Sequence, residues 1–425
     1  METTSFCIKS PYGVTMNNAI PAFLAFLLVV SLPAMTIVAA EPEGEINGDA
    51  ENLQLQVSSS QSTPVAVDNT TNRLGLSGEV RSEYTEYGPN LGMALASADD
   101  QLRVDHDQYT IVDSEFDSAT VEEREAMIQA GYERLRQRMA ELEQREREAA
   151  AAYAAGERSS TEFLQTLLRN HNEAAMLSES IEELDNRADR VPGYSLSASQ
   201  TRADQKTLNY HRTPLRSTLA QLSERPTGDV RHDIVVSTSQ NGYSVAIMAG
   251  NQYIVETSRF DNRDETGSER FENGEAYNHI STLYPWASEF GSGPHFQDNS
   301  PGYYWVEMGH DHGRLDFYFD SRTGDVYREV QQLSASSLPQ TDVKTWSRDG
   351  INMTITETPA NGPVEITVTD PETGDPAQAT ITADGVELGE TGEDGSLWIV
   401  QPIGRYDITA ETESGSVNAT ITDNF

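Results

Sequence analysis

Lysine is nearly absent from this chain of 425 residues. Only three lysines occur, so arginine supplies 26 of the 29 basic residues, and 68 aspartates and glutamates give a formal net charge of −39. Binding to nucleic acid depends on Lys and Arg side chains that displace counterions from phosphates, and an anionic membrane surface repels a chain this acidic. The composition therefore excludes nucleic acid as a partner and disfavours attraction to a membrane surface.

The same imbalance predicts a halophilic protein. Self-repulsion among so many carboxylates strains a compact state in dilute buffer, whereas in molar salt the Debye length falls to about 3 Å and the repulsion is screened. Arg is more weakly hydrated than Lys and pairs bidentately with carboxylates, which explains why Arg remains where Lys is lost. A haloarchaeal source is therefore favoured over the alternative, a generic acidic secreted protein.

Cysteine is also nearly absent, since Cys7 is the only one in the chain. It precedes an apolar segment, residues 20–40, which ends in small residues at Ala40 and is followed by the acidic Glu41. This order is typical of a signal peptide covering residues 1–40. Cleavage after Ala40 would leave no cysteine for disulfides, thiol catalysis or zinc ligation.

An uncleaved signal anchor is the alternative, since the apolar segment can just span about 30 Å of hydrocarbon. In both cases we expect the bulk of the chain outside the cytoplasm, either secreted or held at the membrane only through residues 20–40. The start is open between Met1 and Met16, because residues 16–40 alone have a normal signal length, although this shorter form lacks Lys9. Three Asn-x-Thr triplets agree with export and are candidates for N-glycosylation: Asn69, Asn352 and Asn418.

Residues 41–76 are polar and rich in Ser, Gln and Asn, which predicts a flexible spacer. Residues 77–223 are predicted to form a helical bundle. Its clearest helix starts at a capping box of Thr120 and Glu123, and the apolar seam that follows is broken only by Glu146. The short gap to the next helix favours an antiparallel hairpin in a self-contained bundle. A coiled-coil dimer is the alternative, so this region could also drive homo-oligomerisation.

Residues 228–335 change to a strand pattern. Asn241-Gly242 between two apolar runs is typical of a tight hairpin, a helix is expected over about residues 268–289, and alternating strands follow. The pattern predicts an α+β domain with an antiparallel sheet and one packed helix. Residues 340–363 are predicted to be a linker, with pairing to a flanking sheet left open.

Residues 364–425 alternate apolar and polar side chains between regular turns, which predicts a small β-sandwich. Three motif blocks stand out there: Thr373-Gly374-x-Pro376, Thr391-x-x-Asp394-Gly395 and Gly404-x-Tyr406. These blocks resemble the carboxypeptidase regulatory-like, prealbumin-type sandwich. The resemblance implies seven strands without catalytic residues, used as a spacer, a stabiliser or a ligand-contact module.

A second resemblance concerns the hairpin at residues 315–331. Its Asp320-x-x-x-Gly324-x-Val326 pattern resembles the PepSY-type modules of exported proteins, which implies a non-catalytic accessory or binding role. The whole chain resembles the uncharacterised secreted multidomain proteins of haloarchaea. Together these features predict a multidomain α + β architecture, with a helical bundle or coiled-coil hairpin, an α+β domain and a C-terminal β-sandwich.

The sharpest polar cluster is His310-Asp311-His312. Two histidines at i and i+2 would share a strand face and could bind a metal with a distant carboxylate, but the flanking Gly309 and Gly313 are typical of a hairpin loop. The spacing matches no zinc motif. The chain also has no nucleophile elbow, HExxH pair, phosphate loop or dinucleotide loop. No catalytic residue and no cofactor is predicted, and His310 and His312 are the candidates for a metal.

The sequence thus predicts a non-enzymatic, extracytoplasmic interaction or structural protein whose partner is a protein or a surface glycan. Three adjacent aromatic residues of the α+β domain, Tyr303, Tyr304 and Trp305, are the candidate contact surface. Packing in the core of the sheet is the alternative role for them. The opposing hypothesis is a hydrolase, or an enzyme-associated inhibitory module, with its site in the α+β domain near His310 and His312.

Overall fold

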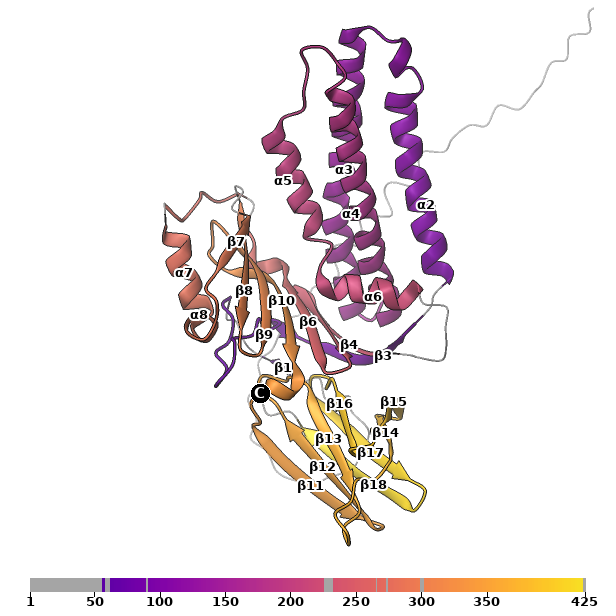
Figure 1. The fold of residues 1–425 in the computed structure, drawn as a ribbon, viewed down its shortest axis with the longest axis vertical. Helices are drawn as coiled ribbons and strands as arrows, with labels where there is room; N and C mark the ends of the chain where they lie inside the picture. Colours follow the sequence, from indigo (N-terminus) through magenta and orange to yellow (C-terminus); the bar gives the residue numbers. More distant parts are fainter. Residues whose placement is uncertain are drawn as a thin grey trace, which may run out of the picture. The chain divides into compact units, whose positions relative to one another are not determined.

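A computed structural model describes residues 56–57, 62–88, 91–224, 232–264, 266–272, 274–298 and 302–422. These residues contain seven α-helices and several antiparallel sheets, which confirms the predicted multidomain α + β architecture (Figure 1). The predicted signal segment and residues 41–55 lie outside the described residues. Among the helices that are described, none combines the length and the apolar character needed to cross a bilayer.

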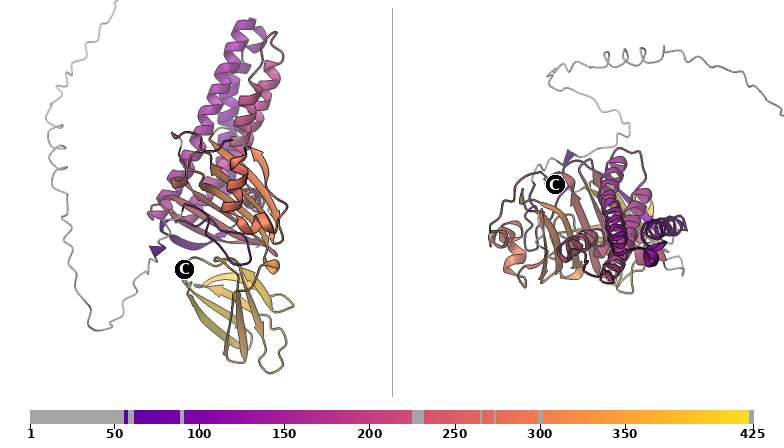
Figure 2. Two further views of the ribbon diagram at one scale, coloured as in Figure 1. Left: turned by 90° about the vertical axis from the view of Figure 1, so that its left-hand side faces the viewer. Right: turned by 90° about the horizontal axis from the view of Figure 1, so that it is seen from above.

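Helices α3 and α4 form the expected antiparallel hairpin, and α2 and α5 run alongside it (Figures 1 and 2). The capping box is confirmed, because the Glu123 N–H donates to Thr120 Oγ1 (3.3 Å) and the Thr120 N–H donates to the Glu123 carboxylate (2.8 Å). Ser159 and Glu162 form the same box at the start of α4. The helices of this region are α2 (Leu91–Gln108), α3 (Val121–Ala154), α4 (Ser160–Ala188), α5 (Ala198–Asn209) and α6 (Pro214–Glu224).

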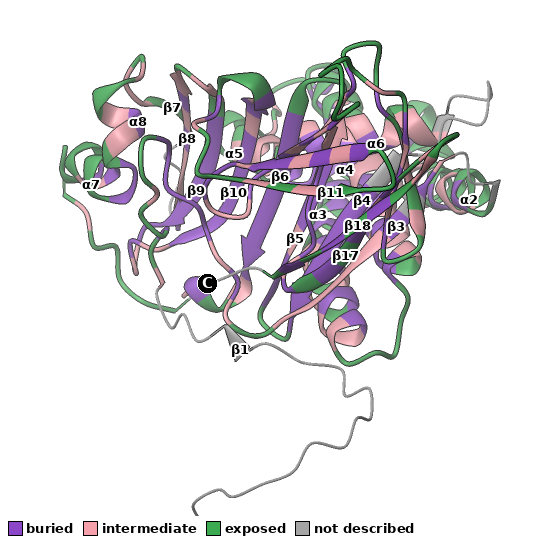
Figure 3. Cartoon of the chain, turned by 90° about the horizontal axis from the view of Figure 1, so that it is seen from below, coloured by how far each residue is buried: buried purple, intermediate pink, exposed green. Residues whose placement is uncertain are grey.

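An eight-stranded antiparallel sheet lies next to these helices. Its strand order is β3-β4-β5-β6-β10-β9-β8-β7, and its middle strands are largely buried (Figure 3). Asn241-Gly242 turns the chain between two neighbouring strands, as predicted. The strands are β3 (Arg81–Tyr87), β4 (His232–Ser239), β5 (Gly242–Ala249), β6 (Gln252–Arg259), β7 (His295–Asp298), β8 (Tyr303–His310), β9 (Gly313–Asp320) and β10 (Val326–Ser334).

Helices α3, α4 and α6 share one hydrophobic core with a face of this sheet. Tyr153, Leu167 and Leu219 from the helices belong to the same buried cluster as Val245 and Ile254 from the strands. The expectation of a self-contained bundle is therefore corrected. The amphipathic pattern shows that a helix has an apolar face, but it does not show whether a helix or a sheet covers that face.

Residues 78–87 correct a second expectation, since the helical region was predicted to begin at residue 77. They form β2 (Gly78–Glu79), which pairs with β1 (Gln56–Val57), and β3. Strand β3 pairs with β4 from Arg81↔Thr238 to Tyr87↔His232. Its partner strand follows about 150 residues later, so a local sequence pattern carries little information about the pairing.

Residues 62–76 are packed, which contradicts the predicted flexible spacer for this part of the chain. Leu74 and Leu76 are 4 % and 5 % exposed. The Asn72 side-chain amide donates to the Leu283 carbonyl (2.8 Å), and the Asn72 carbonyl accepts from Gln331 Nε2 (2.9 Å). Few large apolar residues are needed here, because side-chain amides provide the anchoring hydrogen bonds.

The predicted helix at residues 268–289 is shorter and divided. It consists of α7 (Glu275–Leu283) and α8 (Pro285–Glu289), because Pro285 cannot continue the hydrogen bonding of the first helix. Apolar side chains of this segment, including Ile280 of α7 and Tyr284 between the two helices, pack against Phe317 and neighbouring residues of β8 and β9. Short helical turns occur in both parts. Those between α2 and α3 are η1 (Tyr109–Asp113) and η2 (Phe116–Ser118), and those after strands of the sheet are η3 (Phe260–Asn262) and η4 (Ala335–Ser337).

The C-terminal part is a β-sandwich, as predicted, but it includes the segment expected to be a linker. Residues 342–357 form two of its strands, in agreement with the alternative that this segment pairs with a sheet. Tyr84 OH donates to the Val400 carbonyl (2.6 Å) and so joins the sandwich to β3. The two sheets contain β11 (Asp342–Arg348), β12 (Ile351–Glu357), β13 (Val364–Thr369) and β16 (Ser396–Ile399), and β15 (Val386–Glu390), β14 (Thr380–Ala383), β17 (Arg405–Thr412) and β18 (Gly415–Thr422).

Candidate functional site

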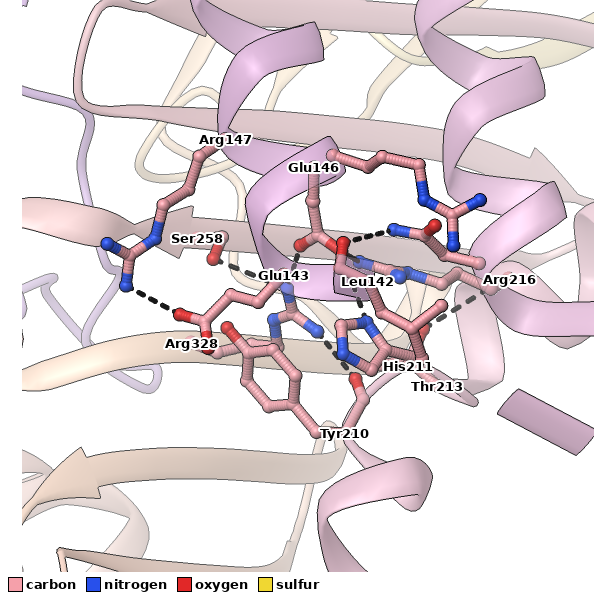
Figure 4. Close-up of polar contacts among 12 residues, drawn as sticks. Leu142, Glu143, Glu146, Arg147, Tyr210, His211, Thr213, Arg216, Ser258 and Arg328 are labelled. Atoms are coloured by element: carbon pink, nitrogen blue, oxygen red, sulfur yellow. Dashed lines mark hydrogen bonds and ion pairs between the residues drawn. The ribbon is translucent and has the colours of Figure 1, made fainter. Parts of the chain in front are cut away.

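Glu146, the residue that breaks the apolar seam of α3, lies in a charge network between the helices and the sheet (Figure 4). Its side chain is 0 % exposed. It forms ion pairs with Arg328 of β10 and with Arg216 of α6, the latter at 2.9 Å between Oε2 and Nη2. Both arginines are also fully buried. The break in the seam is therefore a polar contact to the sheet and not a defect in the helix packing.

Glu256 of β6 is the second carboxylate of the network. It accepts from Nε and Nη2 of Arg216 (3.1 and 2.9 Å) and from the hydroxyl of Thr213. The hydroxyl of Tyr243 lies 2.7 Å from Glu256 Oε1 and 2.8 Å from Glu146 Oε1. The same hydroxyl accepts from Arg216 Nη2 at 2.6 Å. Two carboxylates and two guanidinium groups thus neutralise one another away from solvent.

The electrostatics of the network keep its carboxylates ionised. Burial alone would raise the pKa of Glu146, but attraction to Arg216 and Arg328 holds this pKa well below its usual range. The pKa of Glu256 is lowered by the same two arginines, also against the effect of burial. His211 Nδ1 lies 3.3 Å from Glu146 Oε2, yet burial lowers the pKa of His211, so the imidazole is neutral. The network therefore joins α3 and α6 to the sheet through charge-balanced contacts.

A bulge in β10 turns two consecutive side chains towards the helices. The register shifts between Val326 and Arg328, so Tyr327 and Arg328 both contact Tyr210. The Tyr210 and Tyr327 rings lie 5.8 Å apart, and Arg328 Cζ lies 3.4 Å from the centre of the Tyr210 ring. The hydroxyl of Tyr210 is buried and has no hydrogen-bond partner in the part of the chain that the structure describes.

A cavity of about 270 Å³ opens beside this tyrosine cluster, between α3, α5 and the sheet. Arg263 Nη1 donates to both carboxylate oxygens of Glu143 (2.7 and 2.6 Å), and Arg136 Nε lies 3.4 Å from Asp204 Oδ2. The wall thus combines paired charges with aromatic rings. Three tyrosines complete it: Tyr210, Tyr303 and Tyr327.

The histidine pair lies at the β8–β9 hairpin, as its flanking glycines predicted. Gly313 has φ +147°, and a Cβ there would lie 2.0 Å from a carbonyl oxygen of β10. His312 stacks on Trp286 (4.7 Å) and shares a hydrogen bond with Thr70 through Nδ1 (3.0 Å). His310 contacts the same indole edge-on, and burial lowers its pKa to about 4. No cluster of three or more His, Cys, Asp or Glu suited to a metal ion occurs within the described ranges.

The three aromatic residues proposed as a contact surface do not share one face of the sheet. Tyr304 stacks on Phe319 (4.8 Å) on the side of α7 and α8. Tyr303 and Trp305 contact Tyr318 on the opposite side, at 6.3 and 5.4 Å. All three are half-buried. Strand alternation divides the run, and only Tyr303 reaches the cavity.

The three predicted glycosylation sites lie in different surroundings. Asn69 is exposed in a turn with φ +57°, and Asn418 is exposed on β18. Asn352 is half-buried on β12, where its side-chain oxygen accepts from the Ser347 hydroxyl (2.5 Å). Glycosylation at these positions stays a prediction.

Sequence reasoning singled out Glu146 but missed its partners. Arg328 follows Val326-Tyr327, and Glu256 directly follows Tyr253-Ile254-Val255. A charged residue directly after apolar strand residues is a usable signal, because such a residue is rarely buried without a partner. In a chain with 68 acidic residues this signal is easily lost.

These features define a multidomain α + β protein in which helices joined to an antiparallel sheet precede a β-sandwich. Residues 16–229, half of the chain, match the family model described as Domain of unknown function (DUF7096), and the chain belongs to this family. Residues 234–339 match Family of unknown function (DUF7094), and residues 342–419 match the Archaeal fibronectin-III type-like domain. Neither a curated protein nor a solved structure matches the chain.

The matched model for the sandwich is fibronectin-III type-like and not carboxypeptidase regulatory-like. The described sandwich also has eight strands where the resemblance implied seven. The resemblance to the carboxypeptidase regulatory-like sandwich is not confirmed. Its motif blocks are weakly specific, because their glycines serve turns that many sandwiches need: Gly374, Gly395 and Gly404 all have positive φ (76°, 73° and 111°).

The boundary between the first two family matches does not coincide with a boundary in the packing. Strand β3 belongs to the region matched by the first model, and its neighbour β4 belongs to the region matched by the second. The charge network also joins them, since Glu146 and Arg216 come from the first region and Arg328 and Glu256 from the second.

Proposed function

We propose that this protein is a non-enzymatic structural or interaction protein that works outside the cytoplasm of a halophile. One observation carries the proposal: the charge cluster of Glu146, Glu256, Arg216 and Arg328 is buried and paired within itself. The carboxylates of Glu146 and Glu256 form ion pairs with Arg216 and Arg328, and all four side chains are 0 % exposed. Groups in that position fix one part of a protein against another and do not reach a substrate.

The arrangement suits a protein that presents a surface. The helical hairpin is fixed to the sheet, and the sheet is bonded to a fibronectin-III type-like sandwich through Tyr84 and Val400. Sandwiches of this architecture are widespread in cell-surface proteins. The histidine pair supports the same proposal, because the His310 and His312 rings pack on Trp286 at a hairpin.

Two features of the sequence support the location and the environment. The apolar segment at residues 20–40, with small residues before Glu41, has the order of a secretory signal or anchor. The acidic excess and the loss of lysine suit a surface hydrated in concentrated salt. In such a medium the salt screens the repulsion between the surface carboxylates, so the folded protein is not strained by its net charge.

Cell fractionation tests this proposal. An antibody against the protein detects it in culture medium, membranes and cytosol. The recovered protein is then sequenced from its N-terminus. We expect the protein in medium or membranes, starting at Glu41 if the signal is cleaved, or retaining residues 20–40 if it is an anchor. Recovery from the cytosol with the apolar segment intact contradicts the proposal.

A further inference from the structure

The solvent face of α2 carries a line of apolar side chains. Leu95, Leu102 and Tyr109 are 62 %, 67 % and 59 % exposed, which makes them the three most exposed large apolar side chains among the described residues. They follow one another at intervals of seven residues, and Tyr109 directly follows the last residue of α2. Seven residues are about two turns of an α-helix, so the three side chains lie in one line. We call these three residues the α2 stripe.

The opposite face of α2 is fixed to the rest of the helical region, which sets the rotation of the helix. Val104 is 1 % exposed and belongs to the core that α2 shares with α3 and α4. Asp100 accepts from Nε and Nη2 of Arg169 on α4 (2.9 and 2.8 Å). Helix α2 lies at the edge of the helical region (Figures 1 and 2). The stripe therefore faces solvent because of how the helix is packed.

The spacing of the stripe fits a second helix as its partner. A seam that repeats every seven residues is the pattern by which two helices pack along each other. The seam of α3 cannot serve this purpose, since Ile128 and Leu135 are 0 % exposed within the chain's own core. From Leu95 to Tyr109 the stripe covers about 21 Å of helix. This length is short for a permanent interface and suits a reversible contact.

The charges beside the stripe favour a second copy of this chain. Asp99 and Arg103 are paired on one flank of the stripe (2.7 Å), and His106 lies on the same flank. When two such helices pack antiparallel about Leu102, the same flanks meet, so Asp99 lies opposite the partner's Arg103 and the partner's His106. Acidic groups thus meet basic ones, whereas most contacts between two chains of net charge −39 would bring carboxylates together.

We propose that two copies of this chain associate through the α2 stripe in an antiparallel arrangement. Leu102 packs on the partner's Leu102, and Leu95 packs on the partner's Tyr109. On the other flank, Asp105 lies opposite the partner's Ala98, so no two carboxylates meet there. The contact is isologous, because both copies bury the same residues. The proposal rests on the interaction role proposed above and names one partner, a second copy of the chain.

Sedimentation equilibrium of the full chain in molar KCl measures the association, and we expect a reversible dimer. Leu102→Glu removes two apolar side chains from the centre of the contact and places two carboxylates there, so the dissociation constant should rise about a hundredfold or more. Val343→Glu is the matched control, because Val343 is 56 % exposed on β11 and lies outside the stripe. It adds the same charge and should leave the dimer unchanged.

Disulfide trapping tests which residues meet. In a Cys7→Ser background the chain has no other cysteine, so Leu102→Cys should give a covalent dimer on oxidation, since a disulfide forms only between residues that lie close together. Leu95→Cys alone should stay uncrosslinked, whereas a mixture of Leu95→Cys and Tyr109→Cys chains should crosslink. Val343→Cys is the control and should give no covalent dimer.

Several results overturn this proposal. They are a chain that stays monomeric at every concentration, a dimer that Leu102→Glu leaves intact, and crosslinking of Leu95→Cys with itself, which a parallel pair would give. Two other occupants of the stripe would also overturn it: phosphatidylcholine vesicles, or a different protein, bound by the native chain and lost in Leu102→Glu. None of these results affects the extracytoplasmic role, which the fractionation experiment tests separately.

Discussion

Glu146 and Arg328 form an ion pair between the helices and the sheet, although 182 residues separate them in the chain. Removing one partner of a buried pair leaves the other charge without compensation, which typically costs about 3–5 kcal/mol. We therefore expect Glu146→Ala to lower the free energy of unfolding by about 3–5 kcal/mol. Urea unfolding in molar KCl, followed by tryptophan fluorescence, measures the loss.

Glu141→Ala is the matched control for this variant, because Glu141 is exposed on the same helix. It should change the free energy of unfolding by no more than about 0.5 kcal/mol. A double-mutant cycle isolates the pair itself. Arg328→Met should cost less in a Glu146→Leu background than in the native chain, since Glu256 and Arg216 then balance each other. Equal costs in the two backgrounds would show that the pair is not coupled.

Tyr243 and Tyr210 provide a second comparison, since both are buried tyrosines that contact the network arginines. The Tyr243 hydroxyl has four close partners in the network, whereas the Tyr210 hydroxyl has none among the described residues. Tyr243→Phe removes a hydroxyl that bridges the two buried carboxylates and should lower the free energy of unfolding by about 1–3 kcal/mol. Tyr210→Phe should change it by less than about 0.5 kcal/mol.

Thermal unfolding of the two variants side by side checks this prediction. Both substitutions remove one oxygen atom from a buried ring, so differences in packing volume are small and the hydrogen bonds account for the contrast. Similar Tm losses in the two variants would contradict it. Such a result would mean that the hydroxyl of Tyr243 contributes no more than that of Tyr210.

Local signals in the sequence identified much of the fold. The capping box at Thr120 and Glu123 is present, and Asn241-Gly242 forms its hairpin. Both depend on contacts within a few residues, so the information lies in the segment itself. The β-sandwich was predicted for the same reason, because its strands are short and separated by recognisable turns.

The parts that the sequence did not reveal depend on distant partners. Strand β3 owes its place in the sheet to β4, and residues 62–76 owe their order to contacts such as Asn72 with Leu283. The candidate site shows the same limit. Glu146 could be recognised as an interruption of the seam, but nothing near it in the chain indicated Arg216 or Arg328 as partners.

The acidic surface leads to a prediction about salt. We expect the Tm to rise steeply from dilute buffer to molar KCl, because the self-repulsion of a chain with net charge −39 is screened. Sucrose is the control, since it strengthens apolar burial without screening charge. KCl should therefore stabilise the protein far more than sucrose does. A native fold that is equally stable in salt-free buffer would remove the main argument for a halophilic protein.

The buried histidines lead to a prediction about pH. Burial lowers the pKa of His171 to about 4 in the folded chain, whereas an unfolded histidine titrates near 6.5. The unfolded chain therefore takes up the proton first, so the stability that depends on neutral His171 is complete above about pH 6.5 and is lost as the pH falls towards 4. The free energy of unfolding should decrease over this window.

His171→Gln should reduce the slope of that decrease, measured by urea unfolding between pH 7.5 and 4.5, values chosen to bracket roughly the histidine range. The slope should not vanish, because burial lowers the pKa of His310 to about 4 and also lowers the pKa of His211. His106→Gln is the matched control substitution, since His106 is exposed on α2. An unchanged slope in His171→Gln would show that its imidazole is not kept neutral by the fold.

Below this window, the carboxylates of Glu146 and Glu256 should add a further loss of stability, because their lowered pKa values make protonation of the folded network unfavourable.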